Sequence, residues 1–158
     1  MKIRKATLND LYQLTDLTIK FKLELVQYSP EYMLPYRQEQ KTTEEIQKNI
    51  KTEIENPTGR YLVATDKYKI IAFSYGSHKH TNHVLFKDIK YGTLNYIWID
   101  KNYRHREIGT ELKDKLLKWF KKEKCQYINL VVLEKNPAKK IFKKWGFDKV
   151  LSLMRKKI

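Results

Sequence analysis

The stretch Asn95-Tyr-Ile-Trp-Ile-Asp-Lys-Asn-Tyr-Arg-His-Arg-Glu-Ile-Gly-Thr-Glu-Leu-Lys-Asp-Lys-Leu-Leu117 organises the rest of the chain. Its apolar and aromatic run over 96–99 predicts a strand, and a basic turn follows over 103–107. Apolar residues then recur every four positions, as on one face of a helix, at Ile108, Leu112, Leu116 and Phe120. A strand that ends in a basic turn and opens a helix directs several backbone N–H groups and the positive end of the helix dipole to one place. Such a place favours phosphate.

The turn itself resembles the signature of a known family. Arg104-His105-Arg106-Glu107-Ile108-Gly109 is similar to the acyl-CoA-binding pattern Gln/Arg-x-x-Gly-x-Gly/Ala of the GNAT superfamily of N-acetyltransferases. Glu107 departs from the pattern, because the family usually has its first glycine there, for close backbone approach or an unusual backbone angle. If the turn is already helical at Glu107, its side chain points outward and its N–H still donates. Otherwise the cofactor is held weakly or not at all.

Length and composition predict a single cytoplasmic domain over 1–158. The chain has no apolar run long enough to span a membrane, and its N-terminus lacks the apolar core of a signal peptide. The only cysteine, Cys125, excludes an internal disulfide and is expected to be buried filler.

The chain is strongly basic, with 33 Lys and Arg residues against 18 Asp and Glu and a formal charge of +15. This imbalance admits nucleic acid, an anionic membrane surface or a phosphorylated ligand such as CoA as a partner. Most of the excess is lysine along helices, for which a solvated face is the default interpretation. Two of the six arginines, Arg104 and Arg106, lie in the proposed phosphate turn. We therefore expect no membrane partner and no specific nucleic acid, and only a non-specific attraction to polyanions.

Hydrophobic periodicity predicts mixed α/β structure in the order β, α, α, β, β, β, α, β, α, β. The expected elements are a strand over 2–6, a helix capped by Thr7 that runs to about residue 25, a helix over 43–54, a hairpin of 60–65 and 69–75, the strand 96–99 and its helix, a strand over 127–133, a helix over 136–145 and a last strand over 147–154. The apolar run 127–133 predicts a strand covered on both faces. This order agrees with the GNAT fold, which implies an antiparallel N-terminal half and central strands splayed around a CoA cleft.

A second element carries the same resemblance. The stretch 136–147 is similar to the family's Asn-x-x-Ala-x-x-x-Tyr-x-x-x-Gly-Phe element, with Lys135 at the place of the family asparagine and Phe142 at the place of the family tyrosine. In many members that tyrosine is proposed to protonate the departing CoA thiolate. Phenylalanine keeps the ring packing and cannot supply the proton.

The resemblance implies acetyl-CoA as cosubstrate, held between the strands 96–99 and 127–133. The strand would align the pantetheine arm and polarise the thioester carbonyl, and the turn would hold the pyrophosphate. The implied cofactor-binding residues are Ile97, Trp98, Ile99, Arg104, His105, Arg106, Glu107, Ile108, Gly109, Thr110, Asn136, Lys139 and Phe142.

The amine acceptor must lose a proton, and members of the family commonly use a glutamate on the strand before the signature. No glutamate stands on 92–99 here, so the catalytic candidates are Asn95, which could order a water, and its neighbour Tyr96. A polar residue satisfied within a strand is an equally good interpretation of Asn95. Asp88, Glu31 or a loop histidine are the alternatives. His78, His80 and His83 are read as solvated histidines and not as a metal site, because no cysteine accompanies them.

Two functions follow. The first is an N-acetyltransferase that moves an acetyl group from acetyl-CoA to a small-molecule or protein amine by direct attack. The second is a catalytically weak or inactive GNAT-like domain that binds CoA or acidic partners, suggested by Glu107, Lys135 and Phe142. A nucleic-acid-binding module ranks third, since no recognition motif is evident. The segments 28–36 and 76–92 are expected to set acceptor specificity, and exposed strand edges leave a homodimer open.

Overall fold

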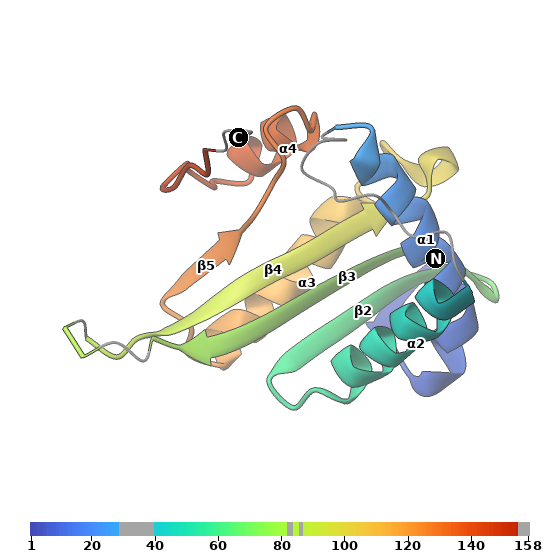
Figure 1. The fold of residues 1–158 in the computed structure, drawn as a ribbon, viewed down its shortest axis with the longest axis horizontal. Coiled ribbons are helices and arrows are strands. Elements are labelled where there is room, and N and C mark those ends of the chain that lie inside the picture. The colour runs from blue at the N-terminus through green and yellow to red at the C-terminus, as the bar shows by residue number, and fades with distance from the viewer. Residues whose placement is uncertain (29–39, 82–83, 86, 155–158) are drawn as a thin grey trace.

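The computed structural model describes residues 1–28, 40–81, 84–85 and 87–154, with backbone only at 40–42. Five strands form one sheet in the order β1-β2-β3-β4-β5, antiparallel from β1 to β4 and parallel between β4 and β5. Figure 1 shows α1 and α2 on one side of this sheet and α3 on the other. The elements are β1 Lys2–Lys5, α1 Leu11–Val26, α2 Gln40–Glu55, β2 Gly59–Asp66, β3 Lys69–His80, β4 Lys90–Ile99, α3 Ile108–Lys122, β5 Tyr127–Leu130 and α4 Ala138–Lys144, with short 3₁₀ turns at Leu8–Asp10 and Lys101–Tyr103. The mixed α/β class and the antiparallel N-terminal half are therefore confirmed.

Each face of the sheet has its own hydrophobic core. Alternation along β2 directs Tyr61 and Val63 to α1 and α2, and Leu62 and Ala64 to α3. The first core adds apolar residues of the two N-terminal helices, and the second adds those of α3, as the four-residue repeat in the sequence predicts. The sheet is thus covered on both faces over β2, β3 and most of β4.

The predicted cap at Thr7 is present at the start of the N-terminal helical region. The Asp10 carboxylate accepts a hydrogen bond from the Thr7 backbone N–H at 2.8 Å and pairs with both terminal nitrogens of Arg4 at 2.7 Å. The Arg4 hydrogen bonds are the main reason that the pKa of Asp10 lies below its usual value, against the opposing effect of burial. This cluster fastens β1 to the beginning of α1.

A β-bulge divides β4 at Asn95. Leu94 pairs with Gly76 and Tyr96 pairs with Tyr75, so Asn95 is an extra residue that pairs with no residue of the β3 backbone. Because side chains alternate along a strand, one extra residue exchanges the two faces. Leu94 accordingly packs in the core beneath α3, whereas Tyr96 and Trp98 pack in the core beneath α1 and α2. We call Lys90–Leu94 the paired half of β4 and Tyr96–Ile99 the released half.

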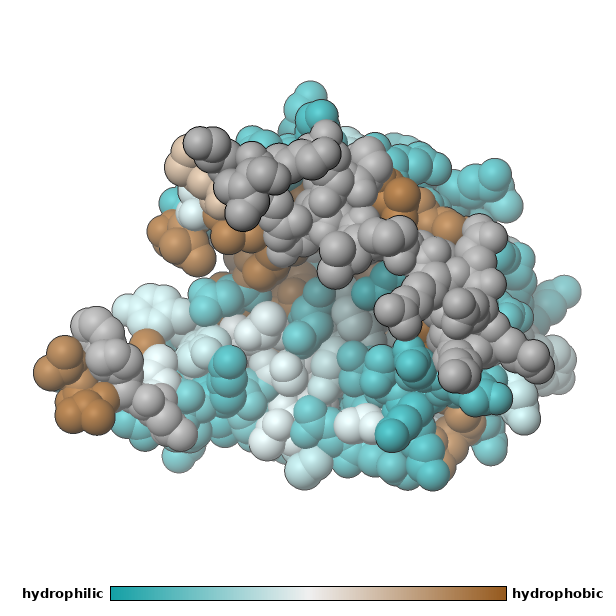
Figure 2. All heavy atoms as spheres, viewed as in Figure 1, coloured by the Kyte–Doolittle hydropathy of each residue, from teal (hydrophilic) through white to brown (hydrophobic). Residues whose placement is uncertain are grey.

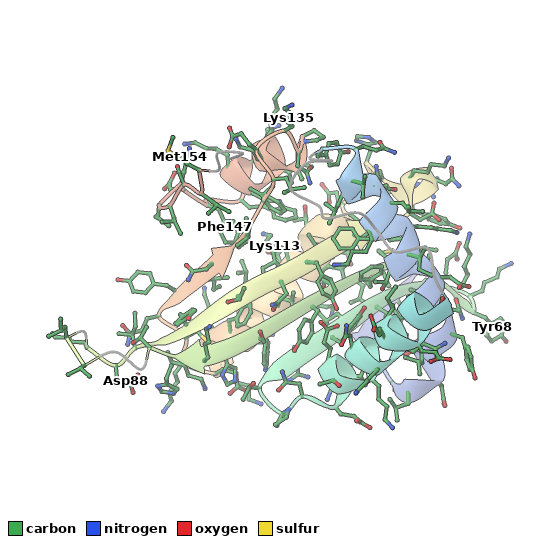
Figure 3. The ribbon with its side chains drawn as sticks, viewed as in Figure 1. Tyr68, Asp88, Lys113, Lys135, Phe147 and Met154 are labelled. Atoms are coloured by element: carbon green, nitrogen blue, oxygen red, sulfur yellow. The ribbon has the colours of Figure 1, made fainter. Side chains whose placement is uncertain are left out.

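The C-terminal part of the chain differs from the sequence prediction. The strand predicted over 127–133 ends at Leu130, and alternate side chains of β5 are exposed, so the prediction of a strand covered on both faces is wrong. Residues 147–154 form no strand, which corrects the predicted last strand. Phe147 is half-buried against the Phe142 ring, but the side chains that follow remain in solvent, with Val150 88% and Leu151 85% exposed. Figure 3 labels Phe147 and Met154 at its ends beside α4, and Figure 2 shows hydrophobic residues gathered in that region.

Cys125 lies between α3 and β5, half-buried at the edge of the core beneath α3. Its backbone N–H donates to the Phe120 carbonyl at 3.0 Å. Burial is the main cause that raises the pKa of its thiol. The expected role as filler is thus consistent with a partly covered side chain.

Candidate functional site

The edge of β4 loses its strand neighbour at the bulge. The parallel pairing with β5 covers only Tyr91 to Leu94, opposite Tyr127 to Leu130. Beyond Leu94 the chain after β5 leaves the sheet and leads to α4, as Figure 1 shows. The released half therefore keeps β3 on one side and has no strand on the other within the described chain.

Strand alternation decides which backbone groups of the released half face that open edge. The Asp100 N–H donates to the Ile71 carbonyl at 2.9 Å, which places Asp100 and, by alternation, Trp98 in hydrogen-bonded pairs with β3. The backbone groups of Ile97 and Ile99 consequently point to the β5 side. The Ile99 carbonyl already accepts a hydrogen bond from Arg104 Nε at 3.0 Å. Ile97 is thus the residue best placed to offer backbone groups to a ligand at this edge.

The turn after β4 brings the chain into α3 through two left-handed residues. His105 has φ 64° and Glu107 has φ 60°, and α3 begins at Ile108. The turn is therefore not helical at Glu107, so the first of the two alternatives given for this residue does not apply. Glu107 adopts a conformation that favours glycine, at a cost of about 1 kcal/mol for a residue with a Cβ. Its side chain is nevertheless exposed.

The start of α3 presents unpaired backbone donors. The first intrahelical bond runs from the Glu111 N–H to the Glu107 carbonyl at 3.0 Å. The N–H groups of Ile108, Gly109 and Thr110 precede it and have no acceptor within the helix. Together with the helix dipole they favour an anion at this end.

The two arginines of the turn have different partners. Arg104 pairs with Glu24 of α1 at 2.7 Å, in addition to the Ile99 carbonyl. Arg106 lies with its guanidinium carbon 5.2 Å from the centre of the Tyr103 ring and is exposed. Arg106 is therefore the more available of the two for an anionic ligand.

Close packing requires the second glycine of the turn. A Cβ on Gly109 would lie 3.0 Å from Ile99 Cδ1 and 3.7 Å from the ring of Trp145, the residue that caps the C-terminal end of α4. Gly109 thereby lets the start of α3 approach both the released half and the C-terminal helix.

Of the three cofactor residues expected in and before α4, only Phe142 packs with the core beneath α3. Asn136 Oδ1 accepts from the Ala138 N–H at 2.9 Å and so fixes the beginning of α4. Lys139 pairs with Glu134 at the surface. Phe142 is half-buried, with its ring 5.7 Å from that of Trp145, and carries no proton that it could donate.

Glu53, which the sequence analysis did not identify as a candidate, contacts Tyr96. The Tyr96 hydroxyl donates a hydrogen bond to Glu53 of α2. Burial raises the pKa of Glu53, and the hydrogen bond from Tyr96 opposes this shift only in part. Burial also raises the pKa of Tyr96, so its hydroxyl keeps its proton. The sequence held one indication that Glu53 is partly buried: it lies beside the apolar stripe of α2, between Ile50 and Ile54.

Glu53 and Tyr96 line a hollow of about 100 Å³ between α1, α2 and β4. Its other lining residues are Thr18, Phe21, Lys22, Ile46, Asn49 and Ile50. The hollow lies on the face to which the bulge turns Tyr96. A carboxylate with a raised pKa, an apolar wall and one cation next to a free strand edge can accept a proton from an amine that is presented there.

A model of the acetyltransferase (GNAT) family matches residues 23–147. The chain belongs to the GNAT family. Its matched part contains Glu53, the bulge, the turn and all of α4.

Solved structures share the GNAT fold over nearly the full chain. A tetramutant of the BH1408 protein from Bacillus halodurans has a TM-score of 0.86 at 19% identity and covers 100% of both chains. A predicted acetyltransferase from Clostridium acetobutylicum, solved with acetyl-CoA, has a TM-score of 0.76 at 18% identity over 99% of this chain and 95% of its own. An aminoglycoside 6'-N-acetyltransferase from Acinetobacter haemolyticus has a TM-score of 0.74 at 16% identity over 100% and 99%. A search of curated proteins by sequence found no match.

The remaining base candidates of this GNAT chain are placed as follows. Asn95 is exposed, and its Oδ1 accepts from Ser77 Oγ at 3.0 Å. Asp88 pairs with His80 at 3.0 Å before the start of β4, about 30 Å from the turn at its other end by the rise of ten strand residues. Figure 3 labels Asp88 at that outer end. Glu31 and His83 lie outside the described residues.

Three further findings concern a metal, His78 and a membrane. Among the described residues, no three His, Cys, Asp or Glu side chains gather closely enough to hold a metal ion. His78 is not at a solvated tip as expected, because its ring packs 5.5 Å from that of Trp119. In the part of the chain that the structure describes, every helix is too short or too polar to cross a bilayer.

Proposed function

We propose that this protein transfers an acetyl group from acetyl-CoA to a primary amine by direct attack of the amine on the thioester. The observation that carries the proposal is the free edge of β4, which begins at Asn95 and leads straight into the donor-rich start of α3. Family membership supports acyl transfer in general. The CoA-type ligand and the choice of an amine are supported by solved relatives of the same fold, one with acetyl-CoA and one that acts on aminoglycosides.

The cofactor would lie along the released half with its pyrophosphate at the turn. Ile97 would offer backbone groups to the pantetheine arm, while the backbone groups of Trp98 are directed to β3. The N–H groups of Ile108, Gly109 and Thr110 would bind the pyrophosphate, assisted by Arg106 and the backbone of His105 and Glu107. Arg104 would contribute less to pyrophosphate binding, because its guanidinium is already paired with Glu24. Asn136, Lys139 and Phe142 would flank the cofactor from the α4 side.

Glu53 is the proposed general base, and Tyr96 positions it. The incoming ammonium gives a proton to Glu53, directly or through one water, and the neutral amine attacks the thioester carbon. The C–N bond forms, the C–S bond breaks, and the CoA thiolate leaves. Phe142 cannot protonate this thiolate, so its proton comes from water or from the amine nitrogen. The raised pKa of Glu53 brings the base closer to neutral pH, where proton transfer is most effective.

Binding of CoA without turnover is the second candidate function. It is favoured by Glu107, which holds a glycine-type backbone angle with a full side chain, and by Phe142, which lacks the acidic hydroxyl expected from the resemblance. Under this alternative Glu53 would have no effect on any transfer rate.

Calorimetric titration with acetyl-CoA at physiological salt tests the cofactor first, with dephospho-CoA as the control. Physiological salt is essential, because a chain of charge +15 attracts any polyanion at low ionic strength. Saturable binding at one site supports the proposal, and CoA release on addition of amines then establishes transfer. Absence of binding would refute it, and binding without release for any amine would establish the second candidate. The acceptor, the cytoplasmic location and the homodimer stay predictions.

A further inference from the structure

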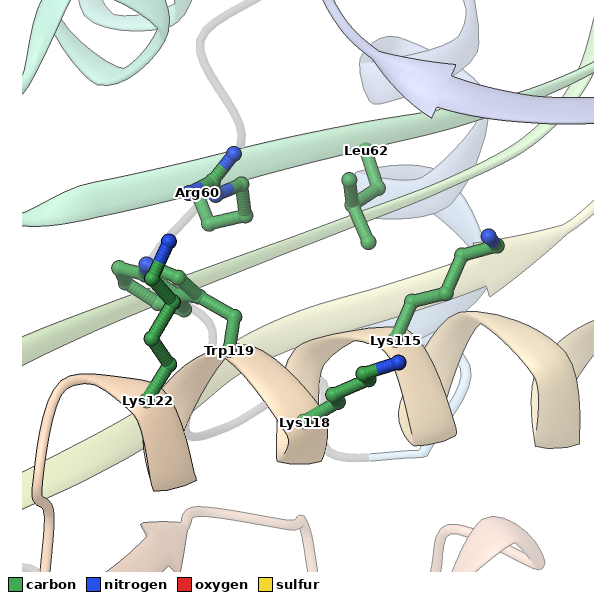
Figure 4. Close-up of a pocket in the computed structure, with 6 residues that line it drawn as sticks. All are labelled: Arg60, Leu62, Lys115, Lys118, Trp119 and Lys122. Carbon is green, nitrogen blue, oxygen red and sulfur yellow. The ribbon is translucent and has the colours of Figure 1, made fainter.

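A second basic site lies on the opposite face of the sheet from Glu53. A groove of about 450 Å³ separates β2 from the C-terminal half of α3 (Figure 4). It is lined by Arg60, Leu62, Lys115, Lys118, Trp119 and Lys122. The groove is open because β1 pairs with β2 only as far as Leu62, so Arg60 lies beyond the end of the neighbouring strand. Figure 4 shows Arg60 reaching from β2 over Trp119 and the lysines projecting from α3.

The positive charges of this groove have no acidic partner in the part of the chain that the structure describes. Among those residues no acid lines the groove, and none of its four cations forms an ion pair. Asp114 pairs instead with Lys113, and Glu123 pairs with His78 and Lys90. The lysines therefore repel one another along α3, since like charges three or four residues apart on a helix are mutually destabilising.

Arg60 packs on Trp119, but its Nε has no hydrogen-bond acceptor among the described residues. Its guanidinium carbon lies 5.3 Å from the centre of the Trp119 ring, and its Nε is buried. A buried donor without an acceptor is costly and calls for an explanation, such as a ligand or ordered water. An anion in the groove would satisfy both the donor and the unpaired charge.

The spacing of the positive side chains indicates which class of anion the groove would bind. Lys115, Lys118 and Lys122 follow one stripe of α3 over about 10 Å, by the rise of seven helical residues. A single phosphate is too small to reach all of them and Arg60. The Trp119 ring is only 7% exposed, covered by Arg60 and the Phe120 ring, so no aromatic face is left on which a nucleobase can stack.

We propose that the groove between β2 and α3 binds a small anion with a chain of two or more phosphate groups. Lysine binds phosphate as a point charge, and the arginine fork can bind two oxygens of one group. The volume of the groove is in the range of small-ligand sites. The site is separate from the proposed cofactor turn, since Lys118 lies ten residues beyond Ile108, about 15 Å along α3.

Calorimetry with inorganic tripolyphosphate at physiological salt tests the groove, with orthophosphate for comparison. Acetyl-CoA is added first to saturation, so that the proposed pyrophosphate site at the start of α3 is filled. Under these conditions we expect one site for tripolyphosphate and much weaker binding of orthophosphate. The variant Lys118→Gln/Lys122→Gln should lower the affinity at least about tenfold, the loss typical of one charged hydrogen bond. The matched control Lys48→Gln/Lys51→Gln removes the same charge from exposed positions of α2, across the sheet, and should change it less than about threefold.

Several outcomes would overturn the proposal. Equal losses in the two double variants would mean non-specific attraction by net charge. Tighter binding of a single-stranded oligonucleotide than of tripolyphosphate, lost in Lys118→Gln/Lys122→Gln, would mean a nucleic-acid surface instead. Competition of acetyl-CoA with tripolyphosphate at one shared site would mean that the groove is not a separate site. Unchanged acetyl-CoA binding in Lys118→Gln/Lys122→Gln, with tripolyphosphate binding lost, supports the proposal and shows that the variant is folded.

Discussion

The two halves of β4 are adjacent in sequence and have opposite surroundings. The paired half has strands on both sides and lies beneath Phe120 of α3. The released half has β3 alone, and its aromatic side chains turn to α1 and α2. Only Asn95 separates them. One unpaired residue thus converts a structural strand into one with a free edge and a side chain aimed at Glu53.

Removal of Asn95 should abolish the difference between the halves and have the largest effect. Leu94 and Tyr96 would then be consecutive opposite Gly76 and Tyr75, so the ladder with β3 would continue without a bulge and the side chains of β4 would keep their faces. Without the bend that a bulge gives its strand, the released half would continue in line with the paired half, and the free edge for the cofactor would be lost. We expect acetyl-CoA binding, measured by calorimetry, to fall at least about a thousandfold. Asn95→Ser keeps the extra residue, so it should leave acetyl-CoA binding unchanged and cost no more than about 1 kcal/mol of unfolding free energy, the value of the hydrogen bond from Ser77.

Replacement of Glu53, the carboxylate that Tyr96 contacts, should show whether the released half of β4 takes part in catalysis. Glu53→Gln should lower kcat about a hundredfold, because general-base catalysis contributes at least that much. Glu55→Gln, exposed on the same helix, is the matched control and should leave kcat unchanged. Steady-state CoA release with the best amine measures both. Equal kcat in Glu53→Gln and the wild type would remove Glu53 from the mechanism.

The same carboxylate should give a characteristic pH dependence. Burial raises the pKa of Glu53 above its ordinary 4.5, so kcat should rise with pH as the proton is lost, with an apparent pKa above 4.5. A raised pKa in the folded state also means that stability falls as pH rises through that pKa. Glu53→Gln should therefore abolish the acidic limb of the rate profile and flatten the pH dependence of stability in the same window. An unchanged acidic limb would assign it to another group.

A side chain in the paired half should be tolerated poorly for a different reason. A Cβ on Gly92 would lie 2.6 Å from the Phe120 ring, which is fully buried. Gly92→Ala should therefore destabilise the protein by about 2 kcal/mol through overpacking and leave the transfer chemistry of the folded fraction intact. The double variant Gly92→Ala/Phe120→Leu relieves the contact, so its cost should be less than the sum of the single costs. Strict additivity would exclude this contact as the cause.

Glycine in place of Glu107, in the turn between the released half and α3, should have the smallest effect, and it should stabilise the protein. Glu107→Gly relieves the left-handed backbone angle and should stabilise the protein by up to about 1 kcal/mol. The exposed side chain of Glu107 predicts only a modest tightening of CoA binding. A gain of several orders of magnitude would instead mean that the natural cofactor site is impaired, which favours the second candidate function.

Local patterns in the sequence predicted the elements that carry strong periodicity. The four-residue repeat from Ile108 located α3, and the β-rich runs on either side of Asp66-Lys67-Tyr68 located the β2–β3 hairpin. The predicted last strand failed because an apolar run such as 150–154 forms a strand only where an edge accepts it. Likewise, the apolar run after residue 127 indicated burial that β5 does not have.

The candidate site was only partly predictable, because its decisive contacts are non-local. The turn and Tyr96 were found from spacing and resemblance, but a bulge leaves almost no mark in a single sequence, apart from an asparagine inside a β-rich run. Glu53 lies 43 residues from Tyr96 in the chain, and only the packing of α2 against β4 brings them together. The groove near Arg60 likewise depends on where β1 stops, which its short sequence does not specify.

The position of Cys125 has a practical consequence for the assay of transfer. Its thiol is half-buried with a raised pKa, so little of it is in the reactive thiolate form at neutral pH. Released CoA is a small, freely diffusing thiol, whereas the protein carries one thiol per chain, which reacts slowly. A chromogenic thiol reagent should therefore record product formation as a rapid continuous signal over a small, slowly developing background from the enzyme itself.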